Sequence, residues 1–321
     1  MDIEKINVEK EVKIVFMGTP EFAVPILEGL IQNYNVRAVV TQPDRPVGRN
    51  GQVRFTPVKE LASKYTVLVL QPEHVKEEWR QIIELDPSLI ITCAYGQLLP
   101  RELLVYPKYG CINVHASLLP KLRGGAPIHH AIIDGHSKTG VTIMHMAPKM
   151  DAGDIISQAE ITIDEKDTTA SLHNKLSQLG KELLLQTLPS ILDGTAPRIK
   201  QEESEVTFGF NIRPEDERID FSKTRKQIYN QIRGLNSWPG AYCMLDGKRM
   251  KIWESYIKED SFPSGFNGQI TNLYSDGIGV KVGNGELVIT ILQPEGKNPM
   301  RAIDYINGQQ KKEALIGRIM E

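Results

Sequence analysis

Residues 13–42 read KIVFMGTPEFAVPILEGLIQNYNVRAVVTQ and contain a β-rich run, an amphipathic stretch and a second β-rich run, in that order. From Val12 to about Ile163, short β-rich runs keep alternating with amphipathic stretches, and LIITCAYG and CINVHA are two further examples. This alternation is typical of a parallel sheet with crossover helices. Ligands of such sheets bind at the carboxyl ends of the strands. The sequence therefore predicts an α/β fold with a Rossmann-like, mostly parallel sheet.

The turn Gly18-Thr19-Pro20-Glu21 joins the first predicted strand to the first predicted helix. Thr19 fits the N-cap of that helix and Pro20 its first position, where the missing N–H has no cost. The turn is not a GxGxxG motif, and the chain contains no GxxxxGK[ST] motif. A nicotinamide cofactor and NTP hydrolysis therefore lack their main sequence support.

A second domain is expected after the sheet. Leucines that recur every three or four residues predict a helix from about Thr168 to Leu192. The polar stretch at about 194–212 has the composition of a linker, which divides the chain into domains 1–205 and 206–321. We then expect a helix from about Ser222 to Leu235, followed by short strands with tight turns at Asp246-Gly247, Asp276-Gly277 and Asn284-Gly285. These strands predict a smaller C-terminal β-barrel of the oligonucleotide-binding (OB) type.

Composition narrows the class of protein. The formal net charge of −2 argues against a protein that coats nucleic acid indiscriminately, but it does not exclude RNA. No apolar run approaches the ~20 residues of a membrane span, and the charged start lacks the features of a signal peptide, so a cytoplasmic protein is expected. The cysteines Cys93, Cys111 and Cys243 are odd in number and widely spaced. This pattern favours reduced buried thiols and no metal site.

The segment CINVHASLLPKLRGGAP (111–127) carries the candidate catalytic side chains. Because side chains alternate along a strand, Asn113 and His115 share one face of the predicted strand, opposite Val114. The amide can donate to a developing oxyanion and the imidazole can transfer a proton, while Asp151 in the later loop KMDAGD can orient the imidazole. By itself, an Asn-x-His at a strand end is more often a satisfied hydrogen-bond pair than a catalytic one.

A set of motifs resembles the methionyl-tRNA formyltransferase family. They are FMGTPEFAVPIL (16–27), TQPDRPVGR (41–49), AYGQLLP (94–100), INVHASLLPKLRGGAPIHHAI (112–132), GVTIMHM (140–146), MDAGDI (150–155), LNSWPGAY (235–242) and LQPEGKNPM (292–300). They cover nearly the whole chain, although NVHxSLLP with a later DxGD is shared by the wider folate-dependent formyltransferases. The resemblance implies transfer of a formyl group from 10-formyltetrahydrofolate to the α-amine of methionyl initiator tRNA, with Asn113, His115 and Asp151 as catalytic residues.

The resemblance also implies binding residues. The folate-contacting positions would be Ser117, Leu118, Leu119 and Pro120, with backbone groups of Tyr95, Gly96, Gln97 and Leu98 around the pterin. The positions implied to contact the tRNA are Arg45, Arg49 and Arg54 in the loop from Pro43 to Pro57, and Lys248, Arg249 and Lys251 in the C-terminal domain. Many relatives have consecutive lysines after the position of Arg49, whereas this chain has Asn50-Gly51-Gln52. We expect a monomer.

Two alternatives stay open from the residues alone. One is a formyltransferase with the same catalytic domain that acts on glycinamide ribonucleotide or an amino sugar nucleotide. The other is a catalytically silent folate or RNA binder. The arginine-containing loop and the barrel argue against the first alternative, and the retained Asn113, His115 and Asp151 argue against the second.

Overall fold

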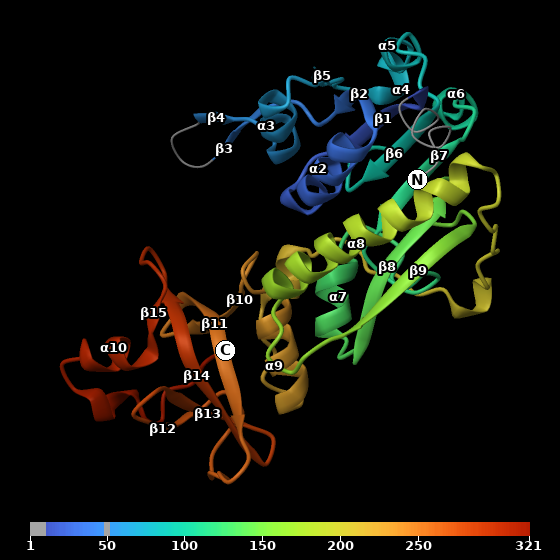
Figure 1. Cartoon of the computed structure of the whole chain (residues 1–321). Helices are drawn as coiled ribbons and strands as arrows, with labels where there is room; N and C mark the ends of the chain where they lie inside the picture. The colour runs from blue at the N-terminus through green and yellow to red at the C-terminus, as the bar shows by residue number, and fades with distance from the viewer. Residues whose placement is uncertain (1–10, 48–51) are drawn as a thin grey trace. The chain divides into compact units, whose positions relative to one another are not determined.

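The structure, a computed structural model, describes residues 11–47 and 52–321. The chain divides into two compact units, each with its own sheet (Figure 1). One unit comprises Met1–Pro127, Thr139–Ile161 and His173–Phe210, and the other comprises Ile128–Lys138, Thr162–Leu172 and Asn211–Glu321. A domain boundary between residues 205 and 206 stays a prediction.

The first unit contains a seven-stranded sheet in the order β5-β2-β1-β6-β7-β8-β9. Its strands are β1 (Lys13–Gly18), β2 (Asn35–Val40), β5 (Leu68–Leu70), β6 (Leu89–Cys93), β7 (Cys111–His115), β8 (Lys138–His145) and β9 (Ile155–Thr162). The pairs from β5 to β7 are parallel, and β8 runs antiparallel to β7. Because β1 lies between β2 and β6, the strand order reverses at β1. A ligand crevice is therefore expected at the carboxyl ends of β1 and β6.

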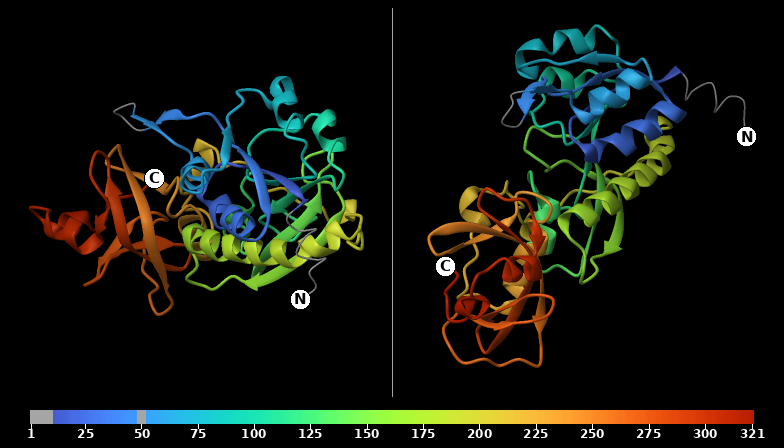
Figure 2. Two further views of the ribbon diagram at one scale, coloured as in Figure 1. Left: turned by 45° about the horizontal axis from the view of Figure 1, so that its top comes forward. Right: turned by 90° about the vertical axis from the view of Figure 1, so that its left-hand side faces the viewer.

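Helices cover this sheet, and the long helix α8 lies against one face (Figures 1 and 2). The helices of this unit are η1 (Glu21–Ala23), α2 (Val24–Asn33), α3 (Pro57–Lys64), α4 (Val75–Glu78), α5 (Arg80–Ile83), α6 (Arg101–Val105), most of α8 (Thr169–Leu192) and η2 (Glu203–Glu205). All of α7 (Pro127–Ile133) except Pro127 belongs to the second unit. A Cβ added at Gly180 of α8 would lie 3.2 Å from Val114 Cγ1. Val114 therefore faces α8, and by alternation Asn113 and His115 project from the opposite face. The predicted helix at 168–192 is confirmed.

The expected N-cap at Thr19 is wrong. The chain first makes a 3-10 turn over Glu21–Ala23, and α2 begins at Val24. The hydroxyl of Thr19 instead donates to the carbonyl oxygen of Tyr95 at 3.2 Å and accepts from the backbone N–H of Gln42 at 3.3 Å. Thr19 therefore joins the loops that follow β1, β2 and β6, which a side chain committed to capping could not do.

The second unit contains an antiparallel sheet in the order β10-β11-β14-β13-β12, with β15 paired to β14. Its elements are η3 (Pro214–Glu217), α9 (Arg225–Gly234), β10 (Ala241–Leu245), β11 (Lys248–Lys258), β12 (Ile270–Leu273), β13 (Ile278–Val282), β14 (Gly285–Pro294), β15 (Met300–Arg301), α10 (Ala302–Asn307) and η4 (Lys312–Leu315). Asp246 and Gly247 have φ of 51° and 72° and form the predicted two-residue hairpin turn. The last predicted turn lies one residue earlier, at Gly283-Asn284, because Gly285 already belongs to β14.

The last residues of the chain close this sheet. The backbone N–H of Met244 in β10 donates to the carbonyl oxygen of Glu321 at 2.7 Å, and that of Ile270 in β12 donates to Arg318 at 2.8 Å. Since β10 and β12 are the two edges of the sheet, residues 317–321 connect them and complete a barrel. The predicted fold class, a mostly parallel α/β sheet domain followed by a smaller antiparallel β domain, is confirmed.

Segments from the middle of the chain complete the second unit. The side chain of Ile133 packs against its apolar core. The guanidinium of Arg233 in α9 donates to the carbonyl oxygens of Asp164 and Asp167 at 3.1 and 2.9 Å. Residues 128–138 and 162–172 are therefore structural parts of this unit.

No helix within residues 11–47 and 52–321 combines the length and the apolar character that crossing a membrane requires.

Cys93, Cys111 and Cys243 are free and buried, and burial raises the pKa of the Cys111 thiol to about 12. These thiols are therefore protonated at neutral pH and poor nucleophiles.

Candidate active site

Strand β7 carries two of the three candidate catalytic side chains. Thr92 in β6 is paired with Asn113 in the sheet, and its hydroxyl donates to Asn113 Oδ1 at 2.8 Å. Because the amide oxygen is engaged in this way, the NH₂ group of Asn113 is the part that can bind an acceptor. The side chain is partly exposed, so a substrate oxygen can reach it.

His115, the next residue on the same face, is buried and contacts the following loop. Its Nε2 lies 3.0 Å from the carbonyl oxygen of Leu122. A carbonyl oxygen only accepts hydrogen bonds, so Nε2 carries a proton. Nδ1 is therefore the ring nitrogen that can take up a further proton.

Asp151, in the loop after β8, faces that second nitrogen. Its Oδ1 lies 3.7 Å from His115 Nδ1, which is close enough to stabilise an imidazolium charge but longer than a hydrogen bond. Its Oδ2 accepts the backbone N–H of Gly124 at 2.9 Å. The structure thus brings together His115 and Asp151, which are far apart in the sequence.

The segments expected to contact folate lie on either side of β7. In the first, the carbonyl oxygens of Ser117 and Leu119 accept bonds from Thr142 and Gln158, at 2.6 and 2.8 Å. These bonds fix the backbone of the segment, while Leu118 and Pro120 remain partly exposed. The cis peptide bond Leu119-Pro120 belongs to this segment.

The second expected folate segment, Tyr95–Leu98, follows β6 at the strand-order reversal. Gly96 has φ of 91°, and a Cβ added to it would meet only Gln42 Nε2, at 3.6 Å, so backbone groups are accessible there. Gln97 Oε1 accepts the N–H of Val75 at 2.9 Å. Leu98 is exposed. Accessible amide groups beside an apolar side chain fit a flat heterocycle with several hydrogen-bonding atoms.

Two of the three expected tRNA-binding arginines lie on a hairpin, formed by β3 (Arg45–Val47) and β4 (Gln52–Arg54), that projects from the first unit (Figures 1 and 2). Arg45 and Arg54 are directly opposed in the two strands, and both are exposed. Arg45 Nη2 lies 3.6 Å from Glu73 Oε2, so this exposed ion pair offsets part of the repulsion between the two opposed arginines. Arg49 lies outside the described residues.

Side-chain contacts anchor the base of this hairpin. Lys59 forms an ion pair with Asp44, and Gln71 Nε2 donates to Asp44 Oδ1 at 2.9 Å. Partial burial disfavours the charged carboxyl, but the hydrogen bonds from Lys59 and Gln71 hold the pKa of Asp44 below its usual value. The hairpin therefore starts from a fixed position.

The three cations expected to bind tRNA in the second unit differ in their surroundings. Lys248 is exposed. The guanidinium of Arg249 lies 3.6 Å from the ring centre of Tyr242 and forms a 2.6 Å ion pair with Glu217. Lys251 Nζ donates to the carbonyl oxygen of Pro239 at 2.6 Å. Lys248 is thus the most accessible of the three.

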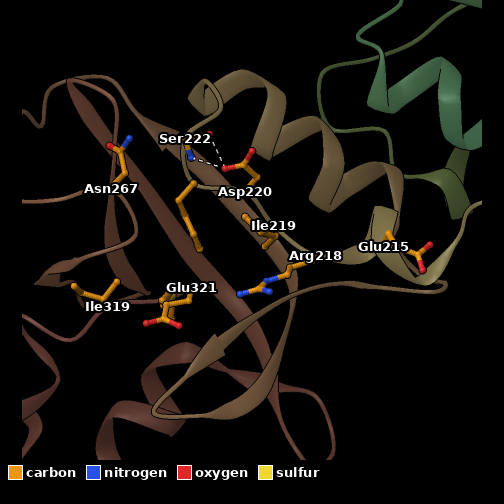
Figure 3. Close-up of a pocket in the computed structure, with 10 residues that line it drawn as sticks. Glu215, Arg218, Ile219, Asp220, Ser222, Asn267, Ile319 and Glu321 are labelled. Carbon is orange, nitrogen blue, oxygen red and sulfur yellow. Dashed lines mark hydrogen bonds between the residues drawn. The ribbon is translucent and has the colours of Figure 1, made fainter.

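A hollow of about 530 Å³ lies in the second unit, between residues 215–222 and the barrel (Figure 3). Its carboxylates are Glu215, Asp220 and Glu321, and Arg218 is its single cation. An anionic ligand would be repelled there, and none of the candidate catalytic residues lines it. Within the described part of the chain, no group of three or more His, Cys, Asp or Glu residues could hold a metal ion.

Comparison with known proteins identifies the family. The Formyl transferase family model matches residues 12–188, and the model for the Formyl transferase C-terminal domain matches residues 211–310. Methionyl-tRNA formyltransferases of Bacillus thuringiensis subsp. konkukian and Bacillus anthracis are each 51% identical to this chain, over 92% of it and 96% of their own length. The chain belongs to the methionyl-tRNA formyltransferase family.

More distant formyltransferase structures share the fold. The N-formyltransferase of Helicobacter canadensis, solved with folinic acid and dTDP-3-aminofucose, aligns with a TM-score of 0.66 at 20% identity, over 88% of this chain and 99% of that one. HypX of Aquifex aeolicus in complex with tetrahydrofolic acid aligns with a TM-score of 0.62 at 17% identity, over 91% of this chain and 46% of that one. The fold of the methionyl-tRNA formyltransferase family thus recurs in proteins of quite different sequence.

Sequence reasoning missed two residues that contact the loops of the candidate catalytic residues, Arg123 and Gln201. Arg123 lies within the LRGG motif, where a charged residue is expected to be exposed, yet it is completely buried. Gln201 lies in a polar stretch without periodicity, in which no pattern distinguishes it from its neighbours. Only the fold reveals their contacts.

Proposed function

We propose that this protein transfers the formyl group of 10-formyltetrahydrofolate to the α-amine of methionine esterified to initiator tRNA, producing formylmethionyl-tRNA for translation initiation. The observation that carries this proposal is the position of Asn113, His115 and Asp151 beside one another at the end of β7, in a chain of this family. An amide donor, a proton acceptor and a carboxylate are the groups that acyl transfer to an amine requires.

The side chains have distinct roles in the proposed mechanism. As the amine attacks the formyl carbon, negative charge develops on the formyl oxygen, and the NH₂ group of Asn113 donates to it. His115 takes up the proton that the amine loses, at Nδ1, because Nε2 is bonded to Leu122. The carboxylate of Asp151 stabilises the imidazolium that results, and the proton then passes to the leaving N10 atom. The formyl group is thereby transferred without a covalent enzyme intermediate.

The binding residues follow from the same proposal. The pterin would lie against the backbone of Tyr95–Leu98 and the segment Ser117–Pro120. Phosphates of the acceptor end would bind Arg45, Arg49 and Arg54, and the tRNA backbone would bind Lys248, Arg249 and Lys251, since phosphate contacts position RNA without reading its sequence. Catalysis is assigned to residues 1–205, and binding of the tRNA backbone is assigned to residues 206–321. We propose a cytoplasmic monomer.

The test is formyl transfer from 10-formyltetrahydrofolate to three acceptors in parallel: methionyl initiator tRNA, methionyl elongator tRNA and glycinamide ribonucleotide. The expected result is a strong preference for the initiator tRNA. Transfer only to the small amine would overturn the assigned substrate while keeping the chemistry of the site. Transfer to none of the acceptors would overturn the catalytic proposal.

A further inference from the structure

Gln201 links the loop of Asp151 to a buried arginine. Its Nε2 donates to the carbonyl oxygens of Asp151 and Gly153, each at 2.8 Å. Its Oε1 accepts from Arg123 Nε at 3.0 Å and from Arg123 Nη2 at 2.8 Å. Since both ends of the amide are engaged, its orientation is fixed: the oxygen faces the guanidinium and the nitrogen faces the Asp151 loop.

Arg123 is itself held between the two backbone groups that contact the catalytic pair, His115 and Asp151. Its neighbour Leu122 accepts from His115, and its other neighbour Gly124 donates to Asp151. The side chain of Arg123 is completely buried. Its buried guanidinium is therefore restricted to one position, and the loop on either side of it is restricted with it.

The segment that carries Gln201 is also bonded to the Arg123 loop through the backbone. The N–H of Arg123 donates to the carbonyl oxygen of Thr207 at 2.9 Å, and its own carbonyl accepts from Gly209 at 2.8 Å. A Cβ added at Gly124 would approach the Gly209 carbonyl oxygen to 2.8 Å. Residues 201–209 are therefore bonded along residues 122–124, whose backbone contacts His115 and Asp151. We call residues 201–209 the brace.

The conformation of Asp151 shows why such a brace is needed. Asp151 has φ of 51°, in the left-handed region that is less favourable for a residue with a Cβ than for glycine. Such a conformation persists only when surrounding contacts determine it. Two of those contacts are the hydrogen bonds from Gln201 to the carbonyl oxygens of Asp151 and Gly153.

We propose that Gln201, oriented by Arg123, is a positioning residue for formyl transfer, which keeps the carboxylate of Asp151 opposite His115 Nδ1. The proposal rests on the proposed function because Gln201 acts through Asp151. It assigns a role in the reaction to the brace, residues 201–209. A misplacement of a catalytic group by about 1 Å costs up to ~10²-fold in rate.

The test compares Gln201→Glu with the unmodified enzyme. Glutamate has nearly the same shape and still accepts from Arg123, but its carboxylate cannot donate to Asp151 or Gly153. We expect kcat to fall by about 10- to 100-fold, while the KM values for 10-formyltetrahydrofolate and methionyl-tRNA change little. Gln201→Ala removes both sets of bonds and should lose at least as much. Gln186→Ala, an exposed glutamine on α8, is the matched control and should keep full activity.

A double-mutant cycle separates positioning from a general effect on folding. If Gln201 acts through Asp151, Gln201→Glu should lower kcat little further when Asp151→Asn is already present. Equal fold losses in both backgrounds would overturn the inference, as would full activity of Gln201→Glu. Full activity of Asp151→Asn alone would overturn the proposed role of Asp151, and the inference with it.

Discussion

Asn113 and Thr92 illustrate how one hydroxyl can decide the chemistry of a site. An amide has a donor end and an acceptor end of almost equal shape. The hydroxyl of Thr92 donates to the oxygen of Asn113, so the NH₂ group remains available to an acceptor. This arrangement suits an oxyanion, which needs donors fixed in place before charge develops.

Asn113→Ala should lower kcat for formyl transfer by about 10²- to 10³-fold, the usual effect of removing one oxyanion donor. The KM for methionyl-tRNA should change little, because the lost contact forms only as the oxyanion develops. Steady-state kinetics on an enzyme of unchanged melting temperature would measure the effect. An unchanged kcat would contradict the role of the amide.

Glu286, in the second unit, is a buried carboxylate whose charge is stabilised by neutral hydrogen-bond donors. This carboxylate is completely buried and is bonded by neutral groups, which include Ser261 and Tyr274 at 2.6 Å each and Asn272 at 2.9 Å. Burial alone would raise its pKa, but these hydrogen bonds outweigh burial and hold the pKa below its usual value. The ionised form therefore stabilises the fold.

Glu286→Gln should destabilise the protein at neutral pH by about 1–3 kcal/mol, because an amide NH₂ cannot accept these donors. Since the folded-state pKa is lowered, the contribution of Glu286 is present above its unfolded-state pKa of about 4.3 and is lost as pH falls through the folded-state pKa. Denaturant unfolding at several pH values would measure this. The variant should lose part of the acid sensitivity of the unmodified protein, and equal stability at pH 7 would contradict the prediction.

At the scale of elements, the β3–β4 hairpin has a fixed base with two arginines beside it. Asp44, Lys59 and Gln71 hold the base. Arg45, the residue after Asp44, is opposed to Arg54 and forms an ion pair with Glu73 at 3.6 Å. An exposed ion pair contributes little to stability, so a phosphate can replace Glu73 beside Arg45 at small cost. The hairpin therefore holds both arginines in defined positions.

Arg45→Ala combined with Arg54→Ala should lower kcat/KM for methionyl-tRNA and leave the KM for 10-formyltetrahydrofolate unchanged. Each lost phosphate contact should also reduce the slope of log(kcat/KM) against log salt concentration by about 1. Lys64→Ala, an exposed cation on α3, is the control and should leave the slope unchanged. A double variant with an unchanged salt slope would show that the hairpin does not bind phosphate.

The closing segment 317–321 is the element that turns an open sheet into a barrel. Gly268, next to β12, has φ of 82°, and a Cβ added there would lie 2.3 Å from the carbonyl oxygen of Met320. An open sheet exposes two edges that pair readily with other chains. Closure therefore protects the second unit from association as well as stabilising it.

Gly268→Ala should displace the closing segment. Its matched control is Gly247→Ala, which also has a positive φ, 72°, but no atom within 4 Å of the added Cβ. The control should lose about 1–2 kcal/mol from backbone strain alone, and Gly268→Ala should lose more. Thermal unfolding with size-exclusion chromatography would measure both effects, and equal losses in the two variants would show that closure contributes little.

At the scale of the whole molecule, sequence patterns predicted what depends on short-range order. Strand alternation put Asn113 and His115 on one face, and turn residues such as Asp246-Gly247 marked the hairpins of the second unit. The bonds of Gln201 and Thr19 could not be predicted, because each depends on a partner more than 40 residues away, Asp151 and Tyr95 respectively. Local propensity predicted Thr19 as an N-cap, but its hydroxyl instead bonds Tyr95 and Gln42, which are distant in the sequence.

The interleaving of the two compact units limits how the gene can be divided. The chain passes from one unit to the other after residues 127, 138, 161, 172 and 210, so no single cut yields two complete units. A fragment that begins near residue 206 would lack the segment that holds α9 and would expose part of its core. Exchange of residues 206–321 between relatives by one recombination event would therefore leave an unfilled core, unless the middle segments were exchanged with them.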